Sequence, residues 1–98
     1  MVKQGDIHEI NIRDERFRVL VVSSDAHNEV RMPWVAPIRR GSVDAPPYLV
    51  ALHDTDPLGG VIDMDRLARR APVGAPIGTI TGGTMSRVRD AIATVFGD

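Results

Sequence analysis

The chain has 98 residues, which suits one small domain and is too short for two independent hydrophobic cores, so we predict a single domain over residues 1–98. Hydrophobic residues make up 43% of the chain and charged residues 26%, which excludes disordered, collagen-like and coiled-coil proteins. The formal net charge is −1, and the lack of cysteine excludes disulfides, thiolate metal sites and a cysteine nucleophile.

Short apolar segments separated by polar turns predict an antiparallel sheet in the first half of the chain. The strongest is the segment 17–23, in which Val19, Leu20, Val21 and Val22 form an unbroken apolar run. Such a run is typical of a strand that is buried on both faces. In chain order, the predicted strands span residues 7–12, 17–23, 34–38 and 48–52.

Shorter elements are predicted in the second half of the chain. Residues 61–62 read as a brief strand. Apolar residues at helical spacing predict one or two helical turns over residues 64–68, bounded by Pro72. The last strand is predicted over residues 77–81, where two glycines, Gly82 and Gly83, end it.

A C-terminal amphipathic helix is the most regular predicted element. Thr84 is a suitable N-cap, and apolar residues recur after it at helical spacing. Several strands followed by a packed helix indicate an α+β domain with a small, strongly bent or barrel-like antiparallel sheet. The apolar stripe of the helix comprises Met85, Val88, Ile92, Val95 and Phe96.

Charges are segregated along the chain. Residues 44–65 contain five aspartates and no lysine or arginine, whereas residues 66–89 contain five arginines and no acidic residue. Arginine also gathers beside two predicted strands, and the clusters converge if these strands are neighbours. The alternative is a solvated edge that prevents strand-to-strand aggregation. The two clusters are Arg13, Arg16 and Arg18, and Arg39 with Arg40.

No local motif specifies a reaction, since the chain lacks a P-loop, a dinucleotide fingerprint, a nucleophile elbow and a zinc-protease motif. The histidines, His8, His27 and His53, are too widely spaced for a local metal motif, so we expect no metal and no cofactor. No apolar run approaches the ~20 residues of a membrane-spanning helix, and the N-terminus lacks the apolar stretch of a signal peptide. These features favour a cytoplasmic protein.

Several segments, taken in chain order, resemble the MazF/PemK family of toxins. Residues 3–7, Lys-Gln-Gly-Asp-Ile, are similar to the basic-Gly-Asp-Ile/Leu opening of the family. Residues 18–28, Arg-Val-Leu-Val-Val-Ser-Ser-Asp-Ala-His-Asn, are similar to its Arg-Pro-Val-Leu-Val-Val-Ser-Asn-Asp-x-x-Asn segment. Residues 35–38, 60–65 and 77–80 resemble later family segments, so the ordered set covers nearly the whole chain.

The resemblance implies an SH3-like, barrel-type sheet with helices and a homodimeric toxin of a type II toxin–antitoxin system. It also implies neutralisation by a labile antitoxin with an acidic, partly disordered tail. Members of the family are mostly sequence-selective, metal-independent endoribonucleases. In that reaction the 2′-OH of single-stranded RNA attacks the adjacent phosphate and leaves a 2′,3′-cyclic phosphate and a 5′-OH. Catalysis then requires proton transfer and stabilisation of charge on the phosphate.

Three residues are expected to be catalytic. Arg18 matches the family's functional arginine, which implies phosphate binding and transition-state stabilisation. His27 is the best-placed base, because histidine ordinarily titrates near neutral pH, and Asp25 or Glu15 is expected to orient it or to replace it. Arg39 stands where the family has Thr and adds positive charge at the same phosphate. The competing interpretation makes His27 and Asp25 ordinary turn or surface residues.

The remaining expected substrate contacts are Arg16, Asp25 and Arg40, with Ser42 as a source of a hydroxyl group. The family's loop between the first two strands is compressed here into residues 11–17, which exposes more of the RNA-binding surface. Together with Arg39, this departure leaves altered specificity and lost cleavage open. Trp34 and Tyr48 are either core residues or platforms for base stacking.

A second family gives the alternative function. Residues 16–19 and 90–98 resemble CcdB, a gyrase poison that uses a C-terminal Trp-Gly-Ile, where this chain has Phe96, Gly97 and Asp98. A third alternative is a noncatalytic relative that binds only RNA or its antitoxin. A toxin of either kind should expose an apolar and basic groove for the antitoxin, with Arg39, Arg40 and the arginines in 66–70 at its rim.

Overall fold

The computed structural model describes residues 2–97 and contains seven strands and two helices within that range. Every strand pair is antiparallel, and the sheet order is β4-β5-β3-β2-β1-β7, with β6 paired to β3. The predicted α+β fold with an antiparallel sheet is therefore confirmed. In chain order the elements are β1 (Asp6–Ile12), β2 (Glu15–Val21), α1 (Asp25–Val30), β3 (Trp34–Arg39), β4 (Leu49–Ala51), β5 (Val61–Asp63), β6 (Ala68–Arg69), β7 (Val73–Thr79) and α2 (Gly82–Phe96).

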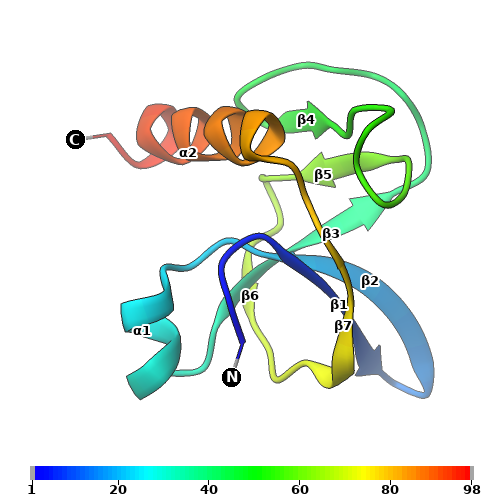
Figure 1. Ribbon diagram of the computed structural model, residues 1–98, viewed down its shortest axis with the longest axis vertical. Helices are drawn as coiled ribbons and strands as arrows, with labels where there is room; N and C mark the ends of the chain where they lie inside the picture. Colours follow the sequence, from blue (N-terminus) through cyan, green and yellow to red (C-terminus); the bar gives the residue numbers. More distant parts are fainter. Residues whose placement is uncertain (1, 98) are drawn as a thin grey trace.

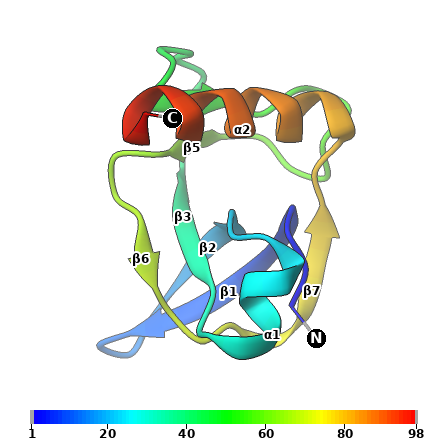
Figure 2. The same cartoon turned by 90° about the vertical axis from the view of Figure 1, so that its left-hand side faces the viewer.

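Strand β3 joins two parts of the sheet. Its first half pairs with β2 and β6, whereas Ile38 and Arg39 pair with β5. Figures 1 and 2 show the result: α2 lies over β4 and β5 at the top, and β1, β2, β3, β6 and β7 curve around the lower part of the molecule. The sheet is therefore strongly bent, as the short strands predict.

Strand β2 contributes to both hydrophobic cores. Leu20 and Val22 join the core that packs against α2, whereas Val19 and Val21 join a second core with Ile10 and Val35. All four residues of the run are buried. This alternation confirms the prediction of a strand buried on both faces, because successive strand residues point to opposite sides of a sheet.

The structure contradicts two sequence-based predictions, one about residues 64–68 and one about the N-cap of α2. Residues 64–68 form no helical turn: Asp63 accepts a hydrogen bond from the backbone N–H of Asp65 at 3.1 Å, and β6 then pairs with β3. A helix this short would leave most of its backbone N–H and C=O groups without partners. Pairing of β6 with β3 supplies backbone hydrogen bonds instead. The N-cap of α2 is Thr81, whose hydroxyl accepts from the Thr84 N–H at 3.3 Å, so Thr84 lies inside the helix.

Two further elements differ from the sequence-based expectation. Strand β7 begins at Val73, earlier than the predicted strand 77–81. The short helix α1 follows β2 in place of a loop, and Ser24 caps it by accepting from the His27 N–H at 3.2 Å. With only six residues, α1 is too short to show a helical repeat in the sequence.

Candidate RNA-binding site

The two arginine clusters beside β2 and β3 reach the same end of the sheet. Because β2 and β3 are antiparallel neighbours, the start of β2, with Arg16 and Arg18, lies beside the end of β3, with Arg39 and Arg40. All four side chains are exposed. The condition for convergence, that the two strands are neighbours, is met.

Arg18 and Arg39 nevertheless point to opposite faces of the sheet. Alternation along β2 places Arg18 on the face of Leu20, opposite to the face of Val19. Arg39 lines a hollow together with Phe17 and Val19, which Arg18 does not line. Arg18 stands opposite Glu9 of β1. The structure therefore does not bring the two predicted catalytic arginines to a common side.

A groove of about 490 Å³ lies on the Arg39 face, and we call it the arginine groove. Its rim carries three arginines: Arg39, Arg66 and Arg70. The floor contains the exposed ring of Phe17, which offers a flat apolar surface. The other apolar lining residues are Ile10, Ile12, Val19, Val35, Pro37, Ile38 and Ala68.

The buried carboxylate of Asp63 contacts two of the rim arginines. Arg39 donates from Nη1 to Asp63 Oδ2 at 2.9 Å, and Arg66 Nε lies 3.7 Å from the same oxygen. We did not expect Asp63 from the sequence, although an acid inside a short apolar strand, three residues before Arg66, is a signal that could have identified it. These contacts fix the arginines beside the apolar floor.

Glu15 shares the face of the arginine groove. It stands opposite Ile12 in the β1–β2 ladder, and directly opposed residues of an antiparallel pair point to the same side. Ile12 itself lines the groove. Glu15 therefore lies on the same face as the groove, beside its lining residue Ile12, although it does not itself line the groove.

His27 and Asp25 lie in α1, which follows the C-terminal end of β2, whereas the arginines gather at its N-terminal end (Figure 1). His27 Nε2 is 3.1 Å from the carbonyl oxygen of Met32, and Asp25 accepts from the backbone N–H of Gln4 at 2.8 Å. Both side chains have structural partners close to α1. The structure does not bring them to the arginine groove.

Arg40 and Ser42 follow β3 in an exposed loop. Arg40 lines a hollow of about 150 Å³ next to the groove, and Arg39 lines both. Ser42 is exposed and lines neither of these two hollows. Arg40 therefore extends the basic surface, whereas Ser42 does not.

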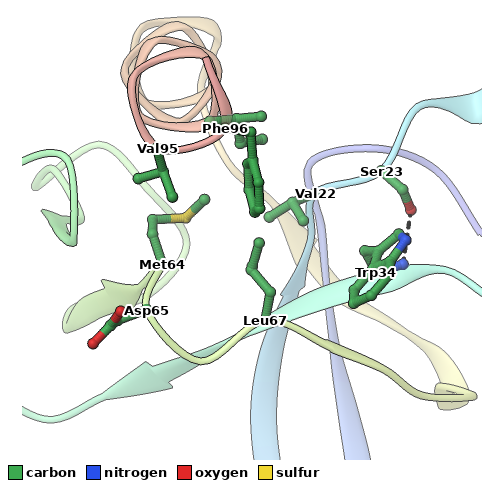
Figure 3. A pocket seen from close by; sticks show the side chains of 9 residues that line it. Val22, Ser23, Trp34, Met64, Asp65, Leu67, Val95 and Phe96 are labelled. Carbon is green, nitrogen blue, oxygen red and sulfur yellow. Dashed lines mark hydrogen bonds between the residues drawn. The ribbon is translucent and has the colours of Figure 1, made fainter.

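A second, mostly apolar groove runs along the end of α2, with a volume of about 630 Å³ (Figure 3). Val95 and Phe96 of α2 face Met64 and Leu67 across it. Trp34 lines its side, and the Arg69 guanidinium lies 5.8 Å from the centre of the Trp34 ring. We call this the helix groove.

Neither Trp34 nor Tyr48 is a core residue, since both side chains are exposed. Trp34 lies in β3 on the wall of the helix groove, and Tyr48 precedes β4. The core alternative for these aromatics is therefore wrong, and base stacking by them stays a prediction.

The most perturbed acid lies outside both grooves, in the loop between β4 and β5, and its carboxylate contacts the start of α2. Burial raises the pKa of the Asp56 carboxyl group, but hydrogen bonds from Thr84, Thr81 and His53 outweigh burial and hold the pKa below its usual value. These hydrogen bonds join the loop that contains His53 to the start of α2. Over residues 2–97, no cluster of three or more His, Cys, Asp or Glu side chains is arranged to hold a metal ion.

The family to which the chain belongs is shown by a match to a protein-family model. The model of the PemK-like, MazF-like toxins of type II toxin–antitoxin systems matches residues 3–96. The chain belongs to this family. No curated protein sequence matches it.

Solved structures of several MazF proteins and endoribonucleases share the fold. A mycobacterial endoribonuclease in complex with its cognate antitoxin is 23% identical, with a TM-score of 0.81 over 98% of this chain and 93% of that one. A mycobacterial endoribonuclease is 25% identical, with a TM-score of 0.77 over 98% and 91%. MazE–MazF from Deinococcus radiodurans is 20% identical, with a TM-score of 0.78 over 98% and 95%.

The MazF/PemK resemblance seen in the sequence is thus confirmed, and the CcdB resemblance is not needed to explain the fold. None of the helices in residues 2–97 has the length and apolar character needed to cross a membrane. Asp98, which was compared with the last residue of CcdB, lies outside the described residues.

Proposed function

We propose that this toxin is an endoribonuclease that cleaves single-stranded RNA and that the arginine groove binds the RNA. The observation that carries the proposal is the combination of three rim arginines with an apolar floor, in a chain whose fold is shared with endoribonucleases. Arginine pairs well with phosphate, and an exposed aromatic ring offers a stacking surface for a base. The groove therefore matches both chemical features of an RNA strand.

The reaction is attack of a ribose 2′-OH on the adjacent phosphate, with departure of the 5′-oxygen. Negative charge grows on the phosphate oxygens in the transition state, so a fixed guanidinium beside them lowers the barrier. We assign this role to Arg39, because Asp63 holds it at the groove. We assign the role of general base to Glu15, because the strand register places it on the face of the groove. Its carboxylate accepts the proton of the 2′-OH.

Arg16 and Arg18 are assigned to phosphates of flanking nucleotides on the other face of β2. Arg16 already lies 3.3 Å from Glu9, which leaves Arg18 as the freer of the two cations. Arg40 extends the basic surface at the end of β3. This assignment moves the central catalytic role from Arg18 to Arg39 and leaves no role in the reaction for His27, whose ring contacts Met32.

The antitoxin partner follows from the family. One of the structural relatives is an endoribonuclease in complex with its cognate antitoxin. We propose that an acidic antitoxin segment covers the rim arginines of this chain and so blocks RNA binding. We also propose that the chain is a homodimer and acts in the cytoplasm, where it meets RNA and antitoxin.

A gyrase poison is the second candidate, and one observation supports it. The Phe96 side chain is 65% exposed beside the C-terminus, where an apolar residue can contact another protein. A gyrase cleavage-complex assay separates the candidates: the nuclease proposal predicts no trapped DNA breaks at any toxin concentration that cleaves RNA. A noncatalytic relative predicts RNA binding without cleavage.

The residue assignment is tested by single-turnover cleavage of a defined RNA by matched arginine variants. Arg39→Ala is expected to slow cleavage by about 100–1,000-fold, the usual cost of losing one transition-state donor. Arg18→Ala is expected to weaken binding with a smaller effect on the rate. Arg31→Ala is the control, because Arg31 is exposed at the end of α1 and its side chain donates to the carbonyl of the neighbouring Val30. Full activity of Arg39→Ala contradicts the assignment.

A further inference from the structure

Asp63 combines two properties that rarely occur together in a surface ion pair. Its side chain is only 3% exposed, whereas those of Arg39 and Arg66 are 60% and 76% exposed. A buried carboxylate is costly unless it is fully hydrogen-bonded. Arg39 and the Asp65 N–H supply hydrogen bonds to the carboxylate, and Arg66 adds an ion pair, while both arginine side chains stay largely exposed.

The orientation of the Asp63 carboxylate is set by the backbone. Oδ1 accepts from the Asp65 N–H at 3.1 Å, which leaves Oδ2 for the arginines. The same Oδ2 atom then receives Arg39 Nη1 at 2.9 Å and lies 3.7 Å from Arg66 Nε. Two guanidinium groups from different segments are thus held side by side around one oxygen.

The charges of this cluster do not cancel. One carboxylate and two guanidinium groups leave one excess positive charge, which equals the charge needed to balance a single phosphodiester. Each guanidinium has five N–H donors, and Asp63 contacts only one nitrogen of each, so several donors remain for a second acceptor. A phosphodiester is also the shape that arginine binds well.

We propose that Asp63 is a positioning residue that holds Arg39 and Arg66 as a two-arginine seat for one phosphodiester of the RNA. The inference rests on the proposed function, because it takes RNA as the ligand of the arginine groove. Asp63 touches no substrate itself. It acts by fixing the separation and orientation of the two cations.

One substitution distinguishes a positioning role of Asp63 from a purely electrostatic role, because the two roles predict opposite changes in RNA affinity. Asp63→Asn removes a negative charge from the groove, so electrostatics alone predicts tighter RNA binding. Asparagine keeps an oxygen for the Asp65 N–H but turns an amide N–H₂ toward the arginines, which releases them. The proposal therefore predicts weaker RNA binding despite the more favourable net charge.

The experiment measures RNA affinity, KM and kcat for Asp63→Asn, using a single-stranded RNA and a 2′-deoxy analogue that cannot be cleaved. The expected result is an affinity about tenfold lower, a raised KM, and a slope of log K against log salt reduced by about 0.7 for each phosphate that the variant no longer neutralises. The control is Asp54→Asn, which makes the same charge change in an exposed loop. Unchanged or tighter binding by Asp63→Asn overturns the proposal.

A general loss of folding is distinguished by a second set of variants. Arg39→Gln and Arg66→Gln change exposed side chains, and their effects on affinity should be less than additive because both arginines bind one phosphate. Adding Asp63→Asn to the double arginine variant should cause no further loss. Additive arginine effects, or a full Asp63→Asn effect without the arginines, overturn the proposal.

Failure of the proposed function gives a different result. If the wild-type chain neither binds nor cleaves RNA, the proposed function is wrong, and the proposed phosphodiester site is wrong as well. If the wild type cleaves RNA but Asp63→Asn is unaffected, only the positioning role is wrong. If the arginine variants lose binding of an acidic antitoxin peptide and keep RNA binding, the seat belongs to the peptide and the proposal is overturned.

Discussion

Replacement of Asp56 by asparagine tests how the loop between β4 and β5 is joined to α2. The buried Asp56 carboxylate accepts hydrogen bonds from Thr84 Oγ1 at 2.6 Å, from Thr81 N at 2.7 Å and from His53 N at 2.7 Å. His53 belongs to the loop, whereas Thr81 and Thr84 belong to the start of the helix. One charged group thus connects the loop with the N-terminus of α2.

The expected cost follows from these hydrogen bonds. Asparagine keeps one acceptor oxygen and places an N–H₂ group where the other oxygen accepts, so at least one hydrogen bond to a charged acceptor is removed. Each such bond contributes about 1.5–3 kcal/mol, and a negative charge at a helix N-terminus adds about 0.3–1 kcal/mol. We predict that Asp56→Asn lowers the free energy of unfolding by about 3 kcal/mol, which is about 12–24 °C in Tm for a domain of this size.

Urea unfolding and thermal melts followed by circular dichroism at pH 7 measure this loss of stability. Asp54→Asn is the matched control, because Asp54 is exposed in the same loop and should change stability by less than about 0.5 kcal/mol. An Asp56→Asn variant as stable as the Asp54→Asn control would refute the assignment of Asp56 as the link between loop and helix.

The lowered pKa of Asp56 adds a dependence on pH. A carboxyl group whose pKa is lower in the folded state stabilises that state above its ordinary pKa, and the contribution disappears as the pH falls through the lowered value. The wild type should therefore lose its advantage over Asp56→Asn on acidification below about pH 4. A stability difference that stays constant from pH 7 to pH 2 contradicts this reasoning.

Three further predictions concern the core and the arginine groove. Leu20→Ala, in the fully buried core under α2, should lower the free energy of unfolding by about 2–5 kcal/mol in urea titrations, whereas a loss below about 1 kcal/mol contradicts the packing described. Phe17→Ala should weaken RNA binding by about 5–100-fold in fluorescence anisotropy with an unchanged Tm, and unchanged affinity would exclude base stacking at this exposed ring. Arg39→Thr, which restores the residue typical of the family, should lower RNA affinity about tenfold, and faster cleavage by this variant would show that Arg39 hinders the reaction.

Most of the sheet could be predicted because its signals are local. The apolar run around Leu20 and the isoleucines at 7, 10 and 12 reflect burial, which each strand records in its own sequence. The end of the chain is similar: the helical repeat from Met85 onward predicts α2, and only its first residue was misplaced. The resemblance to the MazF/PemK family made it possible to predict how these elements assemble into a barrel-type sheet with helices.

The elements that were missed depend on partners distant in the sequence. Strand β6 exists because Ala68 and Arg69 pair with the start of β3, and no feature of residues 64–69 reveals that pairing. Helix α1 buries none of its residues; Ser24 caps its start, and the Asn28 side chain donates to the Ser23 carbonyl, and neither contact is visible as a repeat in the sequence. Tertiary contacts override weak local preferences in such short elements.

The arrangement of the candidate site residues also depends on contacts between segments that are distant in the sequence. Residue types and strand ends correctly placed the arginines at one end of the sheet, but the face on which each side chain lies depends on the β2–β3 register. That register separates Arg18 from Arg39 and brings Phe17 and Glu15 to the Arg39 face. Asp63 was missed because its ion pair with Arg39 spans 24 residues of sequence.

The central claim is most directly tested by incubating the purified chain with a long natural RNA in excess EDTA and mapping both ends of the products. We predict discrete cuts with 5′-OH and 2′,3′-cyclic phosphate ends, which form about 100–1,000-fold more slowly with Arg39→Ala and at the wild-type rate with Arg31→Ala. Intact RNA, or cuts that Arg39→Ala makes at the wild-type rate, would contradict this mechanism.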